Sequence, residues 1–276
     1  EGREDSEITV RNIMYAKIPV FYLEIEFDWR TWHRLAKLSI PTTIEGEYVN
    51  YEIPYGYICR RIPYSDKASL SERAKHEVPG QRWIDKTSKK DGIGLSILND
   101  CKYGFDSTMH ELRVTLLRSP SYPPKWPAVS LESWLKGEEP TDQGRHVARI
   151  GLYPHTGDWR EAQTIRRAIE FNNPLIARLE EPHEGNLPKT YSFIYVDGDD
   201  APATAVKQAE DSTDIVLRLY EPHGREATVT LRVAPGVKEA QEADLLERPT
   251  KPLIIENNQL KLTLKPHEIK TILIRR

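Results

Sequence analysis

Apolar and polar residues alternate along most of this chain. A period of two residues, broken by turn-forming residues, is typical of antiparallel sheets with one buried and one exposed face. The segments that show it are VFYLEIEF (20–27), ELRVTLLR (111–118), ARIGLY (148–153), YSFIYV (191–196), DIVLRLYE (214–221), ATVTLRVA (227–234), QLKLTLK (259–265) and KTILIR (270–275). We therefore predict a mainly β protein.

One segment has the period of a helix, GDWREAQTIRRAIEFNNP (157–174). Asp158 can cap its first turn, and Glu161 stands at the capping-box position. Asn173 should end the helix because the residue before a proline avoids the helical region. The apolar residues on one predicted face are Trp159, Ala162, Ile165 and Ile169.

Three segments lack sheet periodicity. Residues 119–146 contain five prolines, with a short possible helix near Leu131, and residues 63–91 are predicted to be irregular. Residues 180–189, EEPHEGNLPK, have the composition of a linker. We predict a large antiparallel β-sandwich with one helix over residues 1–186, and a small C-terminal β-sandwich over residues 187–276.

Composition narrows the function classes. Charged residues make up 29% of the 276 residues and the net charge is −3, so a nucleic-acid binder with a basic face is not expected. No apolar run has the length of a membrane span, and the acidic start does not resemble a signal peptide. Cys59 and Cys101 are expected to be buried free thiols in a reducing compartment, which predicts a cytoplasmic protein.

Motifs for nucleotide, serine-nucleophile and metal chemistry are absent from the sequence: it has no GxGxxG, GxxxxGK[ST], GxSxG or HExxH. His146 and His155 are expected on either side of a strand, too far apart for a metal pair. Acids such as Asp158 at strand ends are commonly caps and turn formers. Trp126 and Trp134, expected to be exposed, could stack on sugar rings or anchor their loop.

A series of motifs resembles glycoside hydrolase family 38, the α-mannosidases, in its C-terminal, non-barrel half. The motifs are EFDWRTWHRLAKLSIP (26–41), YEIPYGYICR (51–60), GQRWIDKT (80–87), GIGLSILNDCKYGFD (92–106), LRVTLLRSP (112–120), DQGRHVARIGLYPHTGDW (142–159), AIEFNNPL (168–175), VKQAEDSTDIVLRLYEPHGREATVTL (206–231), EADLLE (242–247) and LKPHEIKTILI (264–274). Their order and spacing cover nearly the whole chain.

The resemblance implies a partial supersandwich like that of sugar mutarotases, followed by the family's small final β domain. It also implies that retaining hydrolysis of α-mannosides, by a carboxylate nucleophile and an acid/base partner, takes place in an N-terminal barrel that holds zinc. Those motifs are not in this sequence, so we expect no catalytic residue, cofactor or metal site here, and little activity from this chain alone. We expect a C-terminal portion whose partners are that barrel and α-mannoside sugars.

By the same analogy, loops of the large sandwich reach the rim of the sugar site. The candidate contacts to sugar hydroxyls or to the barrel are Asp100, Tyr103, Asp106, Arg118, Asp142 and His146. Packing between domains and turn formation are the other interpretation of these residues. The stretch LNDCKYGFD (98–106) is predicted to be a strand-to-strand turn at a domain interface.

Two alternatives stay open. The chain could be a free-standing carbohydrate-binding module, or an enzyme like aldose epimerases, which would need a histidine and an acid that face one pocket. A chain without its barrel is also expected to expose an apolar face and to self-associate.

Overall fold

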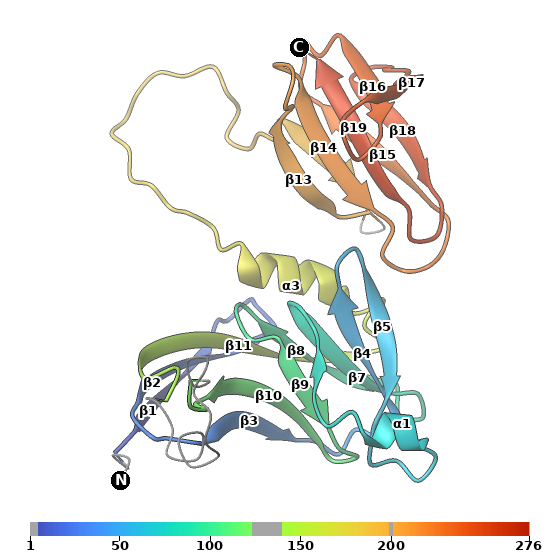
Figure 1. Cartoon of the computed structure of the whole chain (residues 1–276). Helices are drawn as coiled ribbons and strands as arrows, with labels where there is room; N and C mark the ends of the chain where they lie inside the picture. Colours follow the sequence, from blue (N-terminus) through green and yellow to red (C-terminus); the bar gives the residue numbers. More distant parts are fainter. Residues whose placement is uncertain (1–4, 123–139, 199–200, 276) are drawn as a thin grey trace, which may run out of the picture. The chain divides into compact units, whose positions relative to one another are not determined.

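The computed structural model describes residues 5–122, 140–198 and 201–275. They are mainly strands, and the chain divides into two compact units, residues 1–53 with 58–174, and residues 54–57 with 175–276 (Figure 1). The predictions of a mainly β chain, a large sandwich and a C-terminal β domain are confirmed. The predicted boundary at 186/187 falls inside a strand-free segment, 173–193, and stays a prediction.

The first unit contains two facing sheets. One has seven strands in the order β1 (Glu7–Met14), β2 (Phe21–Trp29), β11 (Gly144–Thr156), β8 (Ile93–Asn99), β7 (Trp83–Ser88), β4 (Tyr48–Ile53), β5 (Gly56–Arg61). The other has four, in the order β3 (Leu35–Pro41), β10 (Glu111–Arg118), β9 (Gly104–Ser107), β6 (Val78–Pro79). Pairing is antiparallel throughout, as the period-two pattern predicts.

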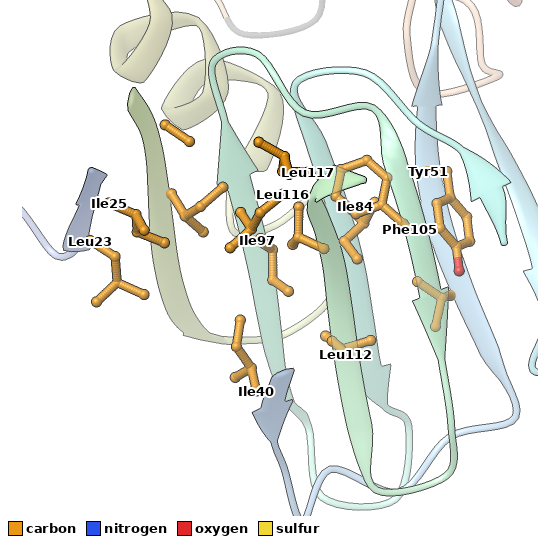
Figure 2. Packing of buried hydrophobic residues seen from close by; sticks show 14 of the residues in the cluster. Leu23, Ile25, Ile40, Tyr51, Ile84, Ile97, Phe105, Leu112, Leu116 and Leu117 are labelled. Carbon is orange, nitrogen blue, oxygen red and sulfur yellow. The ribbon is translucent and has the colours of Figure 1, made fainter. Parts of the chain in front are cut away.

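The core lies between these two sheets. Alternate residues of β2, β8 and β11 point inward and meet the inward rows of β10 and β9, as Ile25, Ile97, Phe105 and Leu112 illustrate (Figure 2). Each fully buried residue of this size contributes roughly 1.5–3 kcal/mol to stability. The alternation visible in the sequence is therefore the alternation between this core and the outer faces.

The prediction that residues 63–91 are irregular is wrong. They contain the one-turn helix α1 (Leu70–Arg73), strand β6 and strand β7, which lies inside the seven-stranded sheet. Strand β7 escapes a period-two search because both of its faces are buried: Ile84 faces the core, while on the outer side Trp83 packs on Trp159 and Asp85 faces a helix. A strand covered on both faces has no polar alternation.

That outer helix is α3 (Thr164–Asn172), which packs on β7 and β8. The prediction placed its start too early. Asp158 and Glu161 do make the reciprocal bonds of a capping box, Asp158 N to Glu161 Oε2 at 3.0 Å and Glu161 N to Asp158 Oδ1 at 3.2 Å, but they close a turn, and the helix proper begins after Gln163. Its end at Asn173 is confirmed. The buried helix residues are Thr164, Ile165, Ala168 and Phe171.

The second unit is a smaller sandwich. One sheet has the order β12 (Ile194–Asp197), β15 (Ala227–Val233), β18 (Gln259–Leu264), and the other β13 (Ala203–Gln208), β14 (Ile215–Tyr220), β19 (Ile269–Arg275), β16 (Glu239–Ala243), β17 (Pro249–Leu253). Its core is formed by inward rows of both sheets, including Leu217, Leu231, Leu262 and Ile272. All strands predicted in this region are present.

Candidate functional site

The predicted rim residues fall into separate regions of the first unit. Arg118, Asp142 and His146 belong to one end of the sandwich, where the β2–β3 loop (30–34), the end of β10 with residues 119–122, and residues 140–146 come together. We call these three segments the β2–β3 corner. Asp100 lies beside the middle of β11, and Asp106 lies on the four-stranded sheet.

Ser119 holds the β2–β3 corner together. Its side chain is buried, accepts a hydrogen bond from Trp29 Nε1 at 3.1 Å and donates one to Thr31 O at 2.8 Å. Its backbone oxygen accepts a hydrogen bond from His33 N at 2.9 Å, and its backbone N–H donates one to Arg34 O at 2.9 Å. The next residue, Pro120, joins the third segment of the corner, because its backbone oxygen accepts a hydrogen bond from Thr141 N at 2.8 Å. Sequence reasoning did not single out Ser119, although a serine beside a proline at a strand end is a turn signal.

The corner exposes groups that could contact a sugar. Asp142 has φ +56°, and its carboxylate faces solvent apart from a bond from Thr141 Oγ1 at 2.9 Å. His146 Nε2 lies 3.0 Å from Asp142 O, and since a carbonyl only accepts, this nitrogen carries a proton. Trp32 and Tyr122, 41% and 55% exposed, supply aromatic surface. Arg118 is exposed and has no ion-pair partner among the described residues. Trp126, Trp134 and the possible helix near Leu131 lie outside those residues.

Asp100 is engaged by a cation. Its carboxylate accepts hydrogen bonds from Arg149 N at 3.1 Å and Arg149 Nε at 2.9 Å. Burial opposes the charged form of Asp100, but the bonds from Arg149 and Cys101 outweigh it and lower the pKa of Asp100. Tyr103 is 56% exposed in the same turn. The stretch 98–106 therefore connects β8 of one sheet to β9 of the other, as the predicted strand-to-strand turn requires.

Asp106 is 6% exposed and lies between two cations. Lys37 of β3 bonds to one oxygen, and Arg113 Nε lies 3.2 Å from the other at an angle that makes an ion pair without a hydrogen bond. A buried carboxylate with two cations is a structural group, since removal of one partner leaves an uncompensated charge. The structure therefore does not bring Asp100 and Asp106 into one acidic site.

The most buried polar cluster was missed by sequence reasoning. His155 of β11 lies with Nε2 2.8 Å from Asp85 Oδ2, and Asp85 also accepts bonds from Ser96 Oγ at 2.8 Å and Thr87 Oγ1 at 2.7 Å. Ser96 in turn lies 2.7 Å from Thr164 Oγ1 of α3. We call Asp85, Thr87, Ser96, His155 and Thr164 the α3 cluster. Little in the local sequence pointed to it, because Asp85 stands beside Lys86 in RWIDKT and His155 follows Pro154 in LYPHTG.

The environment of His155 favours its charged form. Burial opposes that form, but the hydrogen bond to Asp85 and the negative charge of Asp85 outweigh burial and raise the pKa of His155. The side chains of His155 and Asp85 are 3% and 0% exposed, so a substrate has no access to the carboxylate. This arrangement stabilises the fold and does not present a histidine and an acid to a pocket, which an epimerase-like enzyme would need.

The expectation that His146 and His155 lie on either side of a strand is wrong, because both lie on β11. His155 also borders an open groove of about 970 Å³ between the ends of the two sheets. Apart from His155, its polar side chains are His110 and three threonines, and no carboxylate lines it. Such a groove lacks the two carboxyl groups that glycoside hydrolysis requires.

Comparisons with known proteins identify the family. The model of the glycosyl hydrolases family 38 C-terminal domain matches residues 2–125, and the model of that family's C-terminal beta sandwich domain matches residues 203–272. The chain belongs to the C-terminal region of glycosyl hydrolase family 38. The resemblance inferred from the motifs is confirmed.

Relatives of this family 38 chain carry the name α-mannosidase. "Alpha-mannosidase 2C1" of Homo sapiens is 32% identical over 98% of this chain, and "Alpha-mannosidase G" of Dictyostelium discoideum is 29% identical over 90%. The chain spans 24% and 21% of the length of these two proteins. A crystal structure of a family 38 protein from Enterococcus faecalis superposes with a TM-score of 0.76 at 18% identity, covering 98% of this chain and 30% of that one, which shows a shared fold.

No group of three or more metal-ligating side chains occurs in the described part of this family 38 region. The zinc that the resemblance implies therefore has no ligand set among these residues, and we assign no step to it here. Within the same residues, no helix is long and apolar enough to cross a membrane.

The prediction of buried cysteines is wrong, since Cys59 and Cys101 are free but exposed. Cys59 lies near the edge of the seven-stranded sheet on β5, and Cys101 lies in the turn after β8. Partial burial, followed by the hydrogen bond and charge of Asp100, raises the pKa of Cys101 to about 11. This thiol is a poor nucleophile at neutral pH because little of it is thiolate.

Lys86 of β7 provides a test of how the sandwich tolerates buried charge. Its side chain is fully buried, Nζ donates to Met109 O at 2.6 Å, and none of the ion pairs among the described residues includes it. Burial lowers the pKa of Lys86. We expect Lys86→Met to raise the free energy of unfolding by about 1–2 kcal/mol, since the buried charge disappears at the cost of one hydrogen bond.

Denaturant unfolding at several pH values checks this. Because the folded chain binds the Lys86 proton less tightly than the unfolded chain, stability of the unmodified protein should rise as the pH approaches 10.5, and this rise should be absent in Lys86→Met. Lys89 is an exposed lysine three residues further along, and Lys89→Met is the control, which should change neither the free energy of unfolding nor its dependence on pH. A less stable Lys86→Met would show that the ammonium group is favourably solvated.

Proposed function

We propose that this chain is the supporting C-terminal β region of an α-mannosidase, a retaining glycosidase whose catalytic residues and zinc lie in another part of the enzyme. The observation that carries the proposal is the match, over 98% of this chain, to a protein named α-mannosidase that is about four times longer. The geometry agrees, since Asp85, Asp100 and Asp106 are all engaged by cations or hydrogen bonds. None of them is available as a nucleophile.

In this proposal the β2–β3 corner rims the sugar site. Asp142 can accept two hydrogen bonds from neighbouring sugar hydroxyls, and His146 and Arg118 can donate them. Trp32 offers a face on which a pyranose ring can stack. Ser119 holds the β2–β3 loop through its bonds to Thr31, His33 and Arg34, and the bond from Thr141 N to Pro120 O holds the segment that contains Asp142. The chain would thus position the sugar and exclude water at the edge, while bond cleavage takes place elsewhere.

Complementation tests the proposal. We expect this chain and a separately produced catalytic part of the same enzyme each to hydrolyse p-nitrophenyl α-mannoside slowly or not at all, and their mixture to do so at least tenfold faster. The β-mannoside is the control and should stay uncleaved. Two folded polypeptides that neither associate nor gain activity would contradict the proposal, as would hydrolysis by this chain alone.

A second candidate is a free-standing carbohydrate-binding module, which the exposed Trp32 and Tyr122 favour. The same purified chain, without the catalytic part, decides between the supporting region and the binding module. Binding of mannose by this chain alone, seen by calorimetry at millimolar sugar and lost in Trp32→Ala, would support the module. A cytoplasmic location belongs to the first proposal, and the two free cysteines support it.

A further inference from the structure

The two sheets of the first unit differ in width, and the wider one has an uncovered flank. Strand β1 pairs with β2 so that Ile8 lies opposite Phe27 and Val10 opposite Ile25. Cross-strand partners point to the same face of a sheet, so the row Ile8, Val10, Asn12 and Met14, with three apolar residues and one polar residue, points to the side of the core. We call this the β1 row.

The exposure of the β1 row differs sharply from that of its neighbours. Ile25 and Phe27 are 1% and 2% exposed, whereas Ile8 and Val10 are 49% and 47% exposed. The four-stranded sheet ends at β3, whose inward residue Ile40 belongs to the same core cluster as Ile25 and Phe27, and among the described residues that sheet has no further strand to cover the β1 row. One more strand beside β3, at the usual spacing of about 4.8 Å, would lie over the β1 row.

Strand β3 has a free edge that could accept such a strand. It pairs with β10 on one side, and on the other side it has no partner strand among the described residues. At the opposite end of the same sheet, β6 is only two residues long and contains Pro79. Short edge strands with proline prevent further pairing, whereas β3 is seven residues long and its proline, Pro41, stands only at the end.

The charged side chains on the outer faces of β1 and β3 are already paired within the sheets. On β1, Arg11 is paired with Glu24 at 2.6 Å and Glu26 at 2.5 Å, so this guanidinium is occupied within the sheet. Lys37, which projects from the outer face of β3, is occupied by Asp106 and Glu77. The binding surface is therefore the inward β1 row together with the β3 backbone, and it suits an extended segment with apolar residues at alternate positions.

We infer that a β-strand from the catalytic part of the α-mannosidase pairs with the free edge of β3 and covers the β1 row with its apolar side chains. This inference rests on the proposed function. The occupant follows from the comparisons: the chain matches models of C-terminal domains and spans 24% of the human relative, so most of such an enzyme is available to supply the strand. Strand addition of this kind combines backbone hydrogen bonds with burial of alternate side chains.

Hydrogen exchange of the full chain, with and without the separately produced catalytic part, tests the inference. We expect amides of Leu35–Pro41 to exchange at least tenfold more slowly in the mixture. Val10→Lys should weaken the association at least tenfold because it places a charge in the β1 row. Thr9→Lys, at a position that is also exposed but lies on the outer face, should change it less than twofold. Circular dichroism of both variants is the check that each still folds.

The outcomes separate this inference from the proposed function. Recovery of α-mannosidase activity without slower exchange in β3, or equal effects of Val10→Lys and Thr9→Lys, would overturn the inference and leave the proposed function intact. Slower exchange in β3 that grows with the concentration of this chain alone would show a second copy at this edge and would also overturn it. Absence of any association would overturn both.

Discussion

Replacement of Asp85 by alanine is expected to lower the free energy of unfolding of the first unit by about 3–5 kcal/mol. The removed carboxylate accepts hydrogen bonds from Thr87, Ser96 and His155, all at 2.7–2.8 Å. Loss of one member of a buried ion pair costs this much because its partner stays behind without compensation. The cluster also reaches α3 through Thr164, so the helix should loosen.

The pH dependence gives this prediction a second readout. The folded pKa of His155 is raised above the unfolded value of about 6.5, with burial opposing the shift and Asp85 driving it. The stabilisation by the charged pair is therefore complete below about pH 6.5 and is lost as the pH rises through the folded pKa. In Asp85→Ala this loss of stability between neutral and alkaline pH should disappear.

Urea unfolding between pH 6 and pH 9, followed through the first unit, measures both effects. Glu45→Ala removes an exposed ion pair with Lys90, whose side chains are 69% and 74% exposed, and should change stability by less than about 1 kcal/mol. An Asp85→Ala protein as stable as the Glu45→Ala protein, or with an unchanged pH profile, would show that the α3 cluster does not stabilise the fold.

The sequence predicts strands that have one wet face and fails for those that have none. Strands β2, β10, β15 and β18 alternate because water covers one side of each. Strand β7 is covered by the core and by α3, so its sequence contains an aspartate and a lysine that are both fully buried. Its pattern resembles that of a loop, and only tertiary contacts explain these residues.

Candidate residues could be named from the sequence, but their grouping could not. Asp100 and Asp106 are six positions apart, yet one pairs with Arg149 of the seven-stranded sheet and the other with Lys37 of the four-stranded sheet. Asp142 and Arg118, far apart in sequence, share one corner. Pairing between distant strands decides which carboxylates meet cations, and local patterns do not contain that information.

The motifs EPHG and KPHE of the second unit share a carboxylate, which leads to the second prediction. Glu221 is fully buried and accepts hydrogen bonds from the backbone N–H groups of His223 at 2.6 Å, Gly224 at 2.8 Å, Arg225 at 3.2 Å and His267 at 3.0 Å. It thereby ties the β14–β15 turn to the β18–β19 turn. Gly224 has φ +77°, and a Cβ atom there would lie 2.9 Å from His267 Nε2.

Glu221→Ala is expected to lower the free energy of unfolding of the second unit by at least 3 kcal/mol. Four backbone donors would lose their acceptor, and each such buried group costs about 1–3 kcal/mol unless water reaches it. Glu221→Gln should cost less, since one oxygen remains, but it turns an NH₂ group toward some of the same donors. Glu226→Gln, exposed in the same turn, is the matched control and should cost under about 0.5 kcal/mol.

Calorimetry of the full chain distinguishes the two units. Glu221→Ala should lower the melting temperature of the second unit's transition, while Asp85→Ala should lower that of the first, because the two residues belong to separate compact units. A Glu221→Ala chain that melts like Glu226→Gln would show that water replaces the carboxylate. Equal shifts of both transitions by either variant would show that the units unfold together, and the turn contacts of Glu221 would then contribute to the stability of the whole chain.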